Sequence, residues 1–284
     1  MIQEIVDSIE DLTSFPPLAH RALTIAMDND AGVDDLIELV QFDPAVTSNC
    51  LKLCNSSYFG LSEKISSLKQ ALVFLGMRNI INILLTHCIK LPEYDRAHGG
   101  YGLYEGELWR HSVSCAVLSG RLSEKAGCPA DSALFTAALL HDVGKLVLNR
   151  FLEKRYRALC DLIQNRLSLI QAEKALFGIH HAELGGIIAE TWNFPDALIR
   201  SIQDHHRPIA TEGEPDIVSW AGLSNVVAHV CAFRSTCFHS EVVRCFVEPK
   251  ILKRFGLDEA DVDAVAESHE SDMMVADDLF SVAA

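Results

Sequence analysis

The sequence from Ser132 to Phe151 is SALFTAALLHDVGKLVLNRF, and this stretch decides the fold class. Its apolar residues recur at helical spacing, which predicts a helix over residues 131–152. Two polar residues, His141 and Asp142, interrupt the apolar run. Burying an imidazole beside a carboxylate costs free energy unless both groups are paired or bind an ion. Since neutral imidazole and carboxylate suit divalent transition metals, the pair indicates a metal site inside a helical domain.

Helical patterns also dominate the rest of the chain. Asp43 and Pro44 are typical of a helix start, because a capping acid precedes a proline at the first helical position. Gly76 is a possible break in one of the helices. No alternating run bounded by hairpin turns occurs, so we expect an all-α protein without a sheet. Further helices are predicted over residues 31–40, 67–90, 108–126, 156–177, 181–192, 195–205 and 217–233.

The predicted helices fall into two lobes. Residues 92–106 are rich in glycine and tyrosine and have no apolar period, which is typical of a connection between lobes. Residues 207–216 are predicted to form a polar loop. The acidic stretch from residue 258 to 280 is interpreted either as a short helix or as a mobile segment. The predicted division is an N-terminal helical lobe over 1–91, a connecting loop over 92–106, a second helical lobe over 107–240 and a helical or acidic tail over 241–284.

The charge of the chain argues against nucleic-acid binding. The chain has 24 Lys and Arg against 39 Asp and Glu, so its formal net charge is −15. The last 27 residues carry nine of the acidic residues and no Lys or Arg. Binding to a phosphate backbone depends on clustered basic side chains, and no basic stripe is present. We therefore expect no direct contact with nucleic acid.

Cysteine usage and hydropathy predict a cytoplasmic protein without membrane attachment. The nine cysteines are scattered and form no CxxC pair, which is typical of reduced thiols packed as small hydrophobic residues. Cys50 and Cys54 lie one turn apart, and core packing is the preferred interpretation because no His or Cys partner is near. The acidic N-terminus, MIQEIVDSIEDL, does not resemble a signal peptide. Residues 71–91 contain Arg78 and other polar residues, so they fall short of an uninterrupted apolar span.

Histidines are the candidate metal ligands. Seven of the twelve histidines lie between residues 111 and 229. Consecutive positions on a helix point about 100° apart, so an ion shared by His141 and Asp142 needs ligands from other helices. The sequence places candidates for this role on neighbouring predicted helices, namely His111, His181, His205 and His206.

Several motifs resemble known families. LLHDVGK, residues 139–145, resembles the His-Asp motif of the HD superfamily, whose members include metal-dependent phosphohydrolases. FPPLAHRAL (15–23), QFDPAVTSNCLKLCNSSYFG (41–60) and ISSLKQALVFLGMRNI (65–80) are similar to the N-terminal lobe of the HDOD family, the HD-related output domains. ELWRHS, HHAELGG and NFPDALIRSIQDHHRP continue the match, which extends over roughly residues 12–233. The resemblance implies that the second lobe is an HD-type helical bundle.

The resemblance also implies a ligand set. The HD pattern marks His111, His141 and Asp142 as ligands of a first metal. The related HD-GYP phosphodiesterases add a histidine in an H-x-x-x-G setting and a His-His pair. In this chain these are His181 and the pair His205-His206.

This chain departs from the family patterns in two places. The closing aspartate of the HD pattern falls in NVVAHVCAF, residues 225–233, where this chain has His229. This histidine either binds a metal or donates a hydrogen bond to a carbonyl group. The GYP segment expected after the His-His pair is absent, and RPIATEGEPDI stands there instead. The resemblance therefore does not extend to cyclic-di-GMP hydrolysis.

Two functions follow from the resemblance. The first is a regulatory or output module of bacterial signal transduction, which acts through a protein partner or a small phosphorylated ligand. The alternative is an active metal-dependent phosphohydrolase, in which one or two divalent ions (iron, zinc, manganese or nickel) activate water for attack on a phosphoester. Asp142 and Lys145 are the candidate catalytic residues. Lys145 either neutralises a phosphate or forms a salt bridge one turn along its helix.

Overall fold

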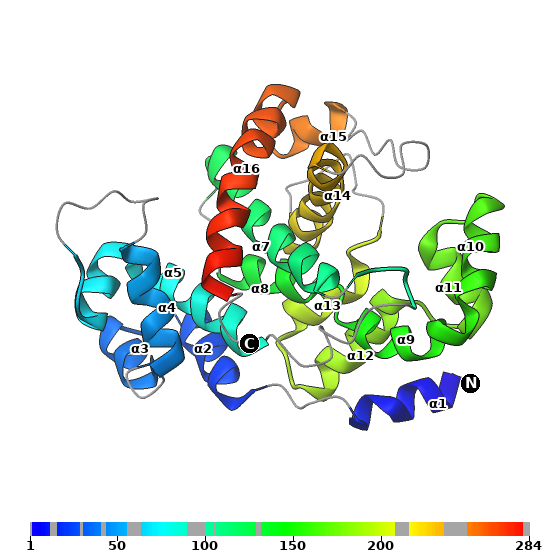
Figure 1. The fold of residues 1–284 in the computed structure, drawn as a ribbon, viewed down its shortest axis with the longest axis horizontal. Helices are drawn as coiled ribbons and strands as arrows, with labels where there is room; N and C mark the ends of the chain where they lie inside the picture. Colours follow the sequence, from blue (N-terminus) through cyan, green and yellow to red (C-terminus); the bar gives the residue numbers. More distant parts are fainter. Residues whose placement is uncertain are drawn as a thin grey trace.

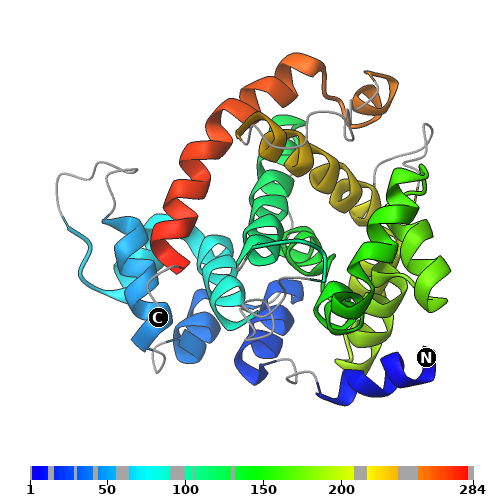
Figure 2. The same ribbon diagram turned by 45° about the vertical axis from the view of Figure 1, so that its right-hand side comes forward.

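The computed structural model of the chain describes residues 2–11, 16–28, 31–40, 44–55, 64–89, 100–104, 106–128, 132–207, 216–235 and 249–280. Within these ranges the chain forms α-helices and short 3-10 helices, and no strand occurs among them. The prediction of an all-α protein is therefore confirmed. Two helices, α7 (Glu107–Lys125) and α8 (Ser132–Leu140), lie near the middle of the molecule in both views (Figures 1 and 2).

Four helices from the first third of the chain pack together, namely α2 (Pro17–Met27), α3 (Val33–Val40), α4 (Pro44–Cys54) and α5 (Leu68–Ile89). Buried apolar residues such as Leu36, Ile80 and Leu84 belong to their core. As the sequence predicts, a helix starts at Pro44 and helical geometry is interrupted at Gly76. There φ is 80° and ψ is 158°, a conformation that glycine adopts without steric cost.

α5 also contacts α8, so it connects the first helices to the rest of the fold. By length and composition alone, residues 68–87 of this helix could cross a membrane, with a mean hydropathy of 1.3. That is weak evidence for a span, because the core helices of water-soluble proteins pass the same test. Here 44% of the segment is buried inside the fold, and α5 packs against α2, α3, α4 and α8.

A second group of helices surrounds α7 and α8. α7 packs against α8 and α14, α12 packs against α9 and α13, and α13 packs against α8 and α14. α1 (Ile2–Asp7), which continues into a 3-10 helix (Ser8–Asp11), also packs against α9 (Figure 1). The bounds of this group are α9 (Gly144–Leu152), α10 (Tyr156–Gln164), α11 (Leu169–Phe177), α12 (His181–Thr191), α13 (Asp196–Asp204) and α14 (Ile217–Ser235), with a 3-10 helix (Glu153–Arg155) before α10.

The single helix predicted over residues 131–152 is wrong, because α8 and α9 are separated by a turn at residues 141–143. Main-chain hydrogen bonds in this turn close over three residues instead of four. His141 Nδ1 also takes the Ala138 carbonyl as its acceptor, at 2.7 Å. The stretch is apolar on all sides, and no proline or glycine precedes the turn, so periodicity could not locate the break. The turn places His141 and Asp142 between two helix ends.

The single helix predicted over residues 156–177 is also two helices, α10 and α11. The second starts with a capping box at Ser168 and Gln171. The Ser168 main-chain N–H donates to the Gln171 side chain at 2.9 Å, and the Gln171 main-chain N–H donates to the Ser168 hydroxyl at 3.4 Å. This Ser-x-x-Gln pattern is a sequence signal for a helix start, and it locates the break that periodicity missed.

The close approach of α9 and α12 depends on two glycines. A Cβ atom at Gly144 would overlap the main-chain carbonyl of His181 and would meet the amide nitrogen of Gly185 at 2.7 Å. A Cβ atom at Gly185 would in turn meet Ile202 Cγ2 at 2.8 Å. Glycine at both positions therefore lets α12 lie directly against α9 and α13. This contact brings His181 beside the turn that carries Asp142.

The acidic C-terminal stretch forms a long helix, α16 (Glu259–Phe280), after the short α15 (Pro249–Arg254). Of the two predicted alternatives for this stretch, a helix is found, and it is longer than the short one predicted. α16 packs against α7, α14 and α4 and therefore contacts both groups of helices (Figures 1 and 2). The Arg121 guanidinium donates to both carboxylate oxygens of Asp272, at 3.0 and 2.6 Å. A buried hydrogen bond of 2.8 Å joins Ser114 Oγ and His269 Nε2.

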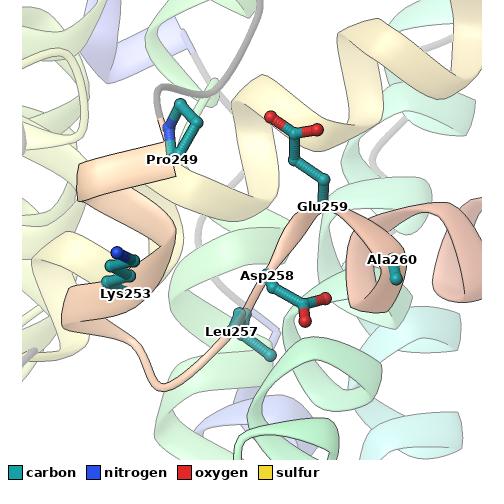
Figure 3. Close-up of a pocket in the computed structure, with 6 residues that line it drawn as sticks. All are labelled: Pro249, Lys253, Leu257, Asp258, Glu259 and Ala260. Atoms are coloured by element: carbon teal, nitrogen blue, oxygen red, sulfur yellow. The ribbon is translucent and has the colours of Figure 1, made fainter.

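A cavity of about 320 Å³ lies where α15 leads into α16 (Figure 3). None of the predicted metal ligands is among its lining residues, so it is separate from the predicted metal site. It is lined by Pro249, Lys253, Leu257, Asp258, Glu259 and Ala260.

Candidate metal centre

Five elements supply the predicted ligands. His111 lies on α7, and His141 and Asp142 lie in the turn between α8 and α9. The remaining predicted ligands come from the first residue of α12 (His181), the residues directly after α13 (His205 and His206) and α14 (His229).

Asp142 lies at the middle of this histidine cluster, and its two carboxylate oxygens face different histidines. Oδ1 lies 3.3 Å from His181 Nε2 and 3.7 Å from His205 Nε2. Oδ2 lies 3.3 Å from His141 Nε2 and 3.7 Å from His111 Nε2. We call these two environments the Oδ1 face and the Oδ2 face. One carboxylate thus joins histidines from four separate elements.

His206 extends the Oδ1 face. Its Nε2 atom lies 2.9 Å from His181 Nε2, and its ring stacks at a tilt on that of His205 with 4.2 Å between the centroids. Ligand atoms of Asp142, His181, His205 and His206 lie within 4.8 Å of one another, as one ion requires. The structure therefore brings together four of the predicted ligands at this face.

Three histidine rings are held in place through Nδ1. His141 Nδ1 bonds to the Ala138 carbonyl at 2.7 Å, and His205 Nδ1 bonds to the Ile202 carbonyl at 2.7 Å. A carbonyl oxygen only accepts, so each Nδ1 is the protonated nitrogen and each Nε2 keeps a free lone pair. His181 Nδ1 lies 2.7 Å from a carboxylate oxygen of Glu173, which fixes its ring in the same way. Metal-binding histidines are typically oriented by such a bond from the second nitrogen.

Three buried polar atoms at the centre have no hydrogen-bond partner among the described residues: His141 Nε2, His205 Nε2 and Asp142 Oδ1. All three side chains have no accessible surface. Leaving a buried polar atom unpaired costs about 1–3 kcal/mol, so three in one side-chain cluster need an explanation. Divalent cations at the two faces would satisfy them, since Asp142 Oδ1 and His205 Nε2 belong to the Oδ1 face and His141 Nε2 to the Oδ2 face.

The spacing of the ligand atoms agrees with this interpretation. With zinc–ligand bonds of about 2.1 Å and a tetrahedral angle, two ligand atoms on one ion lie about 3.4 Å apart. Two of the histidine–carboxylate distances, from His141 Nε2 and from His181 Nε2 to Asp142, are both 3.3 Å. The atoms therefore already have the separation of ligands that share an ion.

The electrostatics of the cluster keep Asp142 charged and favour the neutral form of His205 and His206. Burial would raise the pKa of Asp142, but His141 and Lys145 outweigh burial and hold that pKa well below its usual value. Burial lowers the pKa of His205 well below its usual value, and His141 adds to the effect. Burial and the neighbouring His181 lower the pKa of His206 to about 3. Neutral imidazole is the form that binds metals.

Lys145 forms the salt bridge that was one of its two predicted roles. Its Nζ atom lies 2.5 Å from Asp142 Oδ2, and the lysine is almost fully buried. The ammonium group neutralises the carboxylate on the Oδ2 face. A role for Lys145 in neutralising a phosphate stays a prediction.

Glu173 and Tyr101 belong to the centre but were not predicted. Glu173 on α11 is fully buried and accepts hydrogen bonds from the His181 main-chain N–H at 2.8 Å and from the Tyr101 hydroxyl at 2.8 Å. Burial would raise the pKa of Glu173, but His181 outweighs burial and the pKa is lowered. An acidic residue in a short amphipathic helix gives no sign of burial, so no sequence signal identifies this contact.

Cys115 and Asn225 were also missed, and both lie at the Oδ2 face. Cys115 Sγ is 3.5 Å from His111 Nε2, and Asn225 Oδ1 is 3.1 Å from the same nitrogen. Burial raises the pKa of the Cys115 thiol well above its usual value, and Asp142 adds to the effect. The spacing His-x-x-x-Cys, one helical turn, was the available signal for Cys115.

His229 lies at the edge of the histidine cluster. Its ring stacks on that of His111, with 4.7 Å between the centroids. It belongs to neither of the two groups of mutually close ligand atoms found among the described residues. Within NVVAHVCAF, the contact with a ligand nitrogen comes from Asn225, one turn before His229. A metal-binding role for His229 stays a prediction.

The family is decided by comparison with known proteins. A family model described as the HDOD domain matches residues 12–208. The chain belongs to the HDOD family. This confirms the resemblance found in the sequence, and it covers all of the predicted ligands except His229.

Solved structures with the same fold come from several bacteria. An HDOD domain protein of unknown function from Geobacter sulfurreducens has 24% identity and a TM-score of 0.75, covering 98% of this chain and 97% of that chain. A candidate phosphohydrolase from Shewanella amazonensis has 18% identity and a TM-score of 0.69, covering 97% of each chain. A candidate signal transduction protein from Marinobacter aquaeolei has 19% identity and a TM-score of 0.74, covering 97% of this chain and 61% of that chain. At these identities the likeness shows a shared fold.

A curated relative is an uncharacterized protein of Treponema pallidum, 25% identical over 235 residues. The match covers 78% of this chain and 43% of the relative. The HDOD chain thus spans less than half the length of that protein.

Proposed function

We propose that this chain is an HDOD-type regulatory module of bacterial signal transduction that holds one or two divalent transition-metal ions at the histidine centre. Membership of the HDOD family and the fold shared with a candidate signal transduction protein support the regulatory part. The metal part is carried by one observation, the three buried atoms without partners on His141, Asp142 and His205.

The centre is built to couple ion binding to the positions of helices. Its ligands come from α7, from the α8–α9 turn, from the start of α12 and from the end of α13. Bound ligands must keep fixed distances from the ion, so the free energy of binding also stabilises the packing of these helices. α5 contacts α8, so the first group of helices packs directly against a helix that leads into the centre.

The regulatory proposal states how the helices form two lobes and what kind of partner the protein binds. α2 to α5 form one lobe, α7 to α14 form an HD-type lobe, and the first lobe presents the surface that a partner recognises. The partner is a protein or a small phosphorylated ligand, not nucleic acid or a membrane, and the setting is the cytoplasm. A pull-down from bacterial lysate followed by mass spectrometry tests the protein partner. No specific partner together with robust nucleotide turnover would contradict the regulatory proposal.

Metal content is the first measurement. The protein is purified without a metal-binding tag, and its metal is quantified by mass spectrometry beside His141→Ala and a control variant, His20→Ala, at an exposed position on α2. We expect one or two equivalents of iron, zinc, manganese or nickel in the wild type and the control, and a loss in His141→Ala. Absence of metal from the wild type even after reconstitution would disprove the metal site.

A second candidate function is a metal-dependent phosphohydrolase, and the buried ligand atoms without hydrogen-bond partners favour it because they leave nitrogen and oxygen donors for a metal ion. A divalent ion in such a site would supply Lewis-acid catalysis at phosphorus. Asp142 and the histidines would hold and orient it, and Lys145 would neutralise substrate phosphate. A panel of phosphodiesters and nucleotides, assayed with the metal-loaded protein, tests this function. Turnover that is lost in His141→Ala would support it, and no metal-dependent turnover would reject it.

A further inference from the structure

The Oδ2 face of Asp142 contains a thiol beside its histidines. Cys115 lies one turn after His111 on α7, and residues four apart on a helix share one face. Its Sγ atom is 3.5 Å from His111 Nε2. Ligand atoms of His111, Cys115 and His141 all lie within 4.8 Å of one another.

These distances match ligation by a common ion. With zinc–sulfur bonds of about 2.3 Å and zinc–nitrogen bonds of about 2.1 Å, a sulfur and a nitrogen on one tetrahedral ion lie about 3.6 Å apart. The observed separation of Cys115 Sγ and His111 Nε2 is 3.5 Å. Two donors one turn apart on a helix are also a recurrent arrangement for a zinc site.

A second observation points to a ligand at the same place. His141 Nε2 is wholly buried and has no hydrogen-bond partner, and its Nδ1 atom is already committed to the Ala138 carbonyl. Packing of Cys115 as a small core residue would account for the thiol but would leave that nitrogen unsatisfied. An ion between His111, Cys115 and His141 accounts for both.

The charges of the Oδ2 face also favour a thiolate ligand, because a cation there has little negative charge beside it. Its histidines are neutral ligands, and Asn225, which contacts His111 Nε2 at 3.1 Å, contributes a neutral amide. The one carboxylate, Asp142, is shared with the Oδ1 face and is paired with Lys145. Among the described residues at this face, Cys115 is the remaining group that can add negative charge next to a cation.

A pair of closely spaced cysteines on another helix shows the contrast. Cys50 and Cys54 on α4 are also one turn apart and fully buried, but no group of metal-binding side chains among the described residues includes them. Burial raises the pKa of Cys50 to about 12, and Cys54 adds to the effect. The same spacing thus occurs once with ligand partners and once as core packing.

We propose that Cys115 is a thiolate ligand, with His111 and His141, of a divalent transition metal at the Oδ2 face. This rests on the proposed metal centre and narrows its chemistry. Thiolate selects borderline and soft ions such as zinc, cobalt(II), iron(II) and cadmium over magnesium and calcium. Binding breaks the S–H bond, releases the proton to solvent and forms a sulfur–metal bond from the sulfur electron pair, so no oxidant or reductant is needed.

Titration of the metal-free full-length protein with cobalt(II) tests the proposal. Thiolate bound to cobalt(II) gives a charge-transfer band in the near ultraviolet, whereas histidine and carboxylate ligands give only the weaker visible bands. We expect the near-ultraviolet band in the wild type and its loss in Cys115→Ser. Proton release on saturation, measured by pH-stat at neutral pH, should fall by one proton per protein in Cys115→Ser.

Two control variants make the assignment specific. Cys50→Ser changes an equally buried cysteine on α4, and Cys231→Ser changes the buried cysteine on α14. Both should keep the near-ultraviolet band and the full proton release. If Cys115→Ser fails to fold, Cys115→Ala replaces it, and the wild-type band and proton count still decide the question.

The outcomes distinguish the proposed metal centre from the proposed role of Cys115 as its thiolate ligand. Cobalt binding without a near-ultraviolet band in the wild type overturns the role of Cys115 and leaves the histidine centre standing. A band that survives Cys115→Ser and disappears in Cys231→Ser assigns the thiolate elsewhere and also overturns it. No cobalt binding at all overturns both the metal centre and the thiolate ligand.

Discussion

The two faces of Asp142 have similar ligands but opposite surroundings. On the Oδ1 face, His181 is backed by the buried carboxylate of Glu173, which in turn accepts a bond from Tyr101. On the Oδ2 face, the nearest charged group is the ammonium of Lys145. The Oδ1 face therefore has an additional carboxylate, that of Glu173, bonded to one of its histidines. The Oδ2 face instead has an ammonium group, that of Lys145, bonded to the Asp142 carboxylate.

The difference shows how one carboxylate can contribute to two metal sites with different needs for negative charge. A negative charge behind a histidine makes that ring a stronger donor toward a cation, so the Oδ1 face needs no further anion. The Oδ2 face has its share of the Asp142 charge neutralised by Lys145, so a cation there needs another negative ligand. The thiol of Cys115 lies where such a ligand is required.

The largest expected effect comes from Asp142→Asn, which removes the anion that both faces share. We expect loss of all bound metal. The buried ammonium of Lys145 would also lose its partner, which costs on the order of 3–5 kcal/mol. Metal analysis and urea unfolding of the metal-free protein measure the two effects separately.

A double variant separates charge from ligation in that experiment. Lys145→Met in the Asp142→Asn background removes the unpaired ammonium, so most of the lost stability should return while metal binding stays absent. Full metal content in Asp142→Asn would show that Asp142 does not join the two faces.

The next largest effect is expected from Glu173→Gln, which alters only the Oδ1 face. Loss of a partner that orients a metal-binding histidine lowers affinity by about 10–100-fold. A zinc titration against a chelator of known affinity measures the change. Glu183→Gln is the matched control, since Glu183 caps α12 beside His180 and pairs with Lys174 at the surface. Equal losses in both variants would mean that the effect comes from α12 stability and not from His181.

The fold class and most of the centre were predictable from the sequence, because their signals are local. The His-Asp pair interrupts an apolar run, and each of His111, His181 and His205 lies in a recognisable motif. The family match over residues 12–208 confirms the motifs on which this prediction rests.

The contacts that were missed depend on tertiary structure. Glu173 reaches His181 only because the chain reverses at Gly178, where φ is 81°, and neither periodicity nor spacing reveals that approach. In the sequence, Cys115 looks like an ordinary core residue, and its ligand role is suggested only when the fold places His141, from the α8–α9 turn, beside it. Tyr101 lies in a region without apolar period, so its anchoring role has no counterpart in the sequence pattern.

Acid should weaken the metal-free protein through the histidines of both faces. The pKa values of His111, His205 and His206 lie below the ordinary value of 6.5 in the folded chain. Their contribution to stability is therefore complete above pH 6.5 and is lost as the pH falls toward about 3, the value for His206. Asp142, with a pKa lowered from 3.8, loses its contribution only at more acidic pH. We expect the free energy of unfolding to fall between pH 6.5 and 5.

Urea unfolding at several pH values tests this and compares the faces. The quantity compared is the slope of the free energy of unfolding against pH. Well below pH 6.5, each buried histidine that stays neutral contributes up to about 1.4 kcal/mol per pH unit to this slope. His111→Asn and His205→Asn should each reduce the slope, one from each face, whereas the exposed control His20→Asn should not. A slope unchanged in His205→Asn would show that the Oδ1 face takes up protons without unfolding.

The smallest effect is expected from Tyr101→Phe, which removes one hydrogen bond to Glu173 and leaves the carboxylate in place. The loss of one such bond costs about 1 kcal/mol of folding free energy. Because Glu173 keeps its charge and its bonds to His181, zinc affinity should fall less than in Glu173→Gln. Tyr104→Phe, at an exposed position in the same segment, is the control. If Tyr101→Phe lowers zinc affinity as much as Glu173→Gln does, then the position of the Glu173 carboxylate, and not its charge, limits binding at the Oδ1 face.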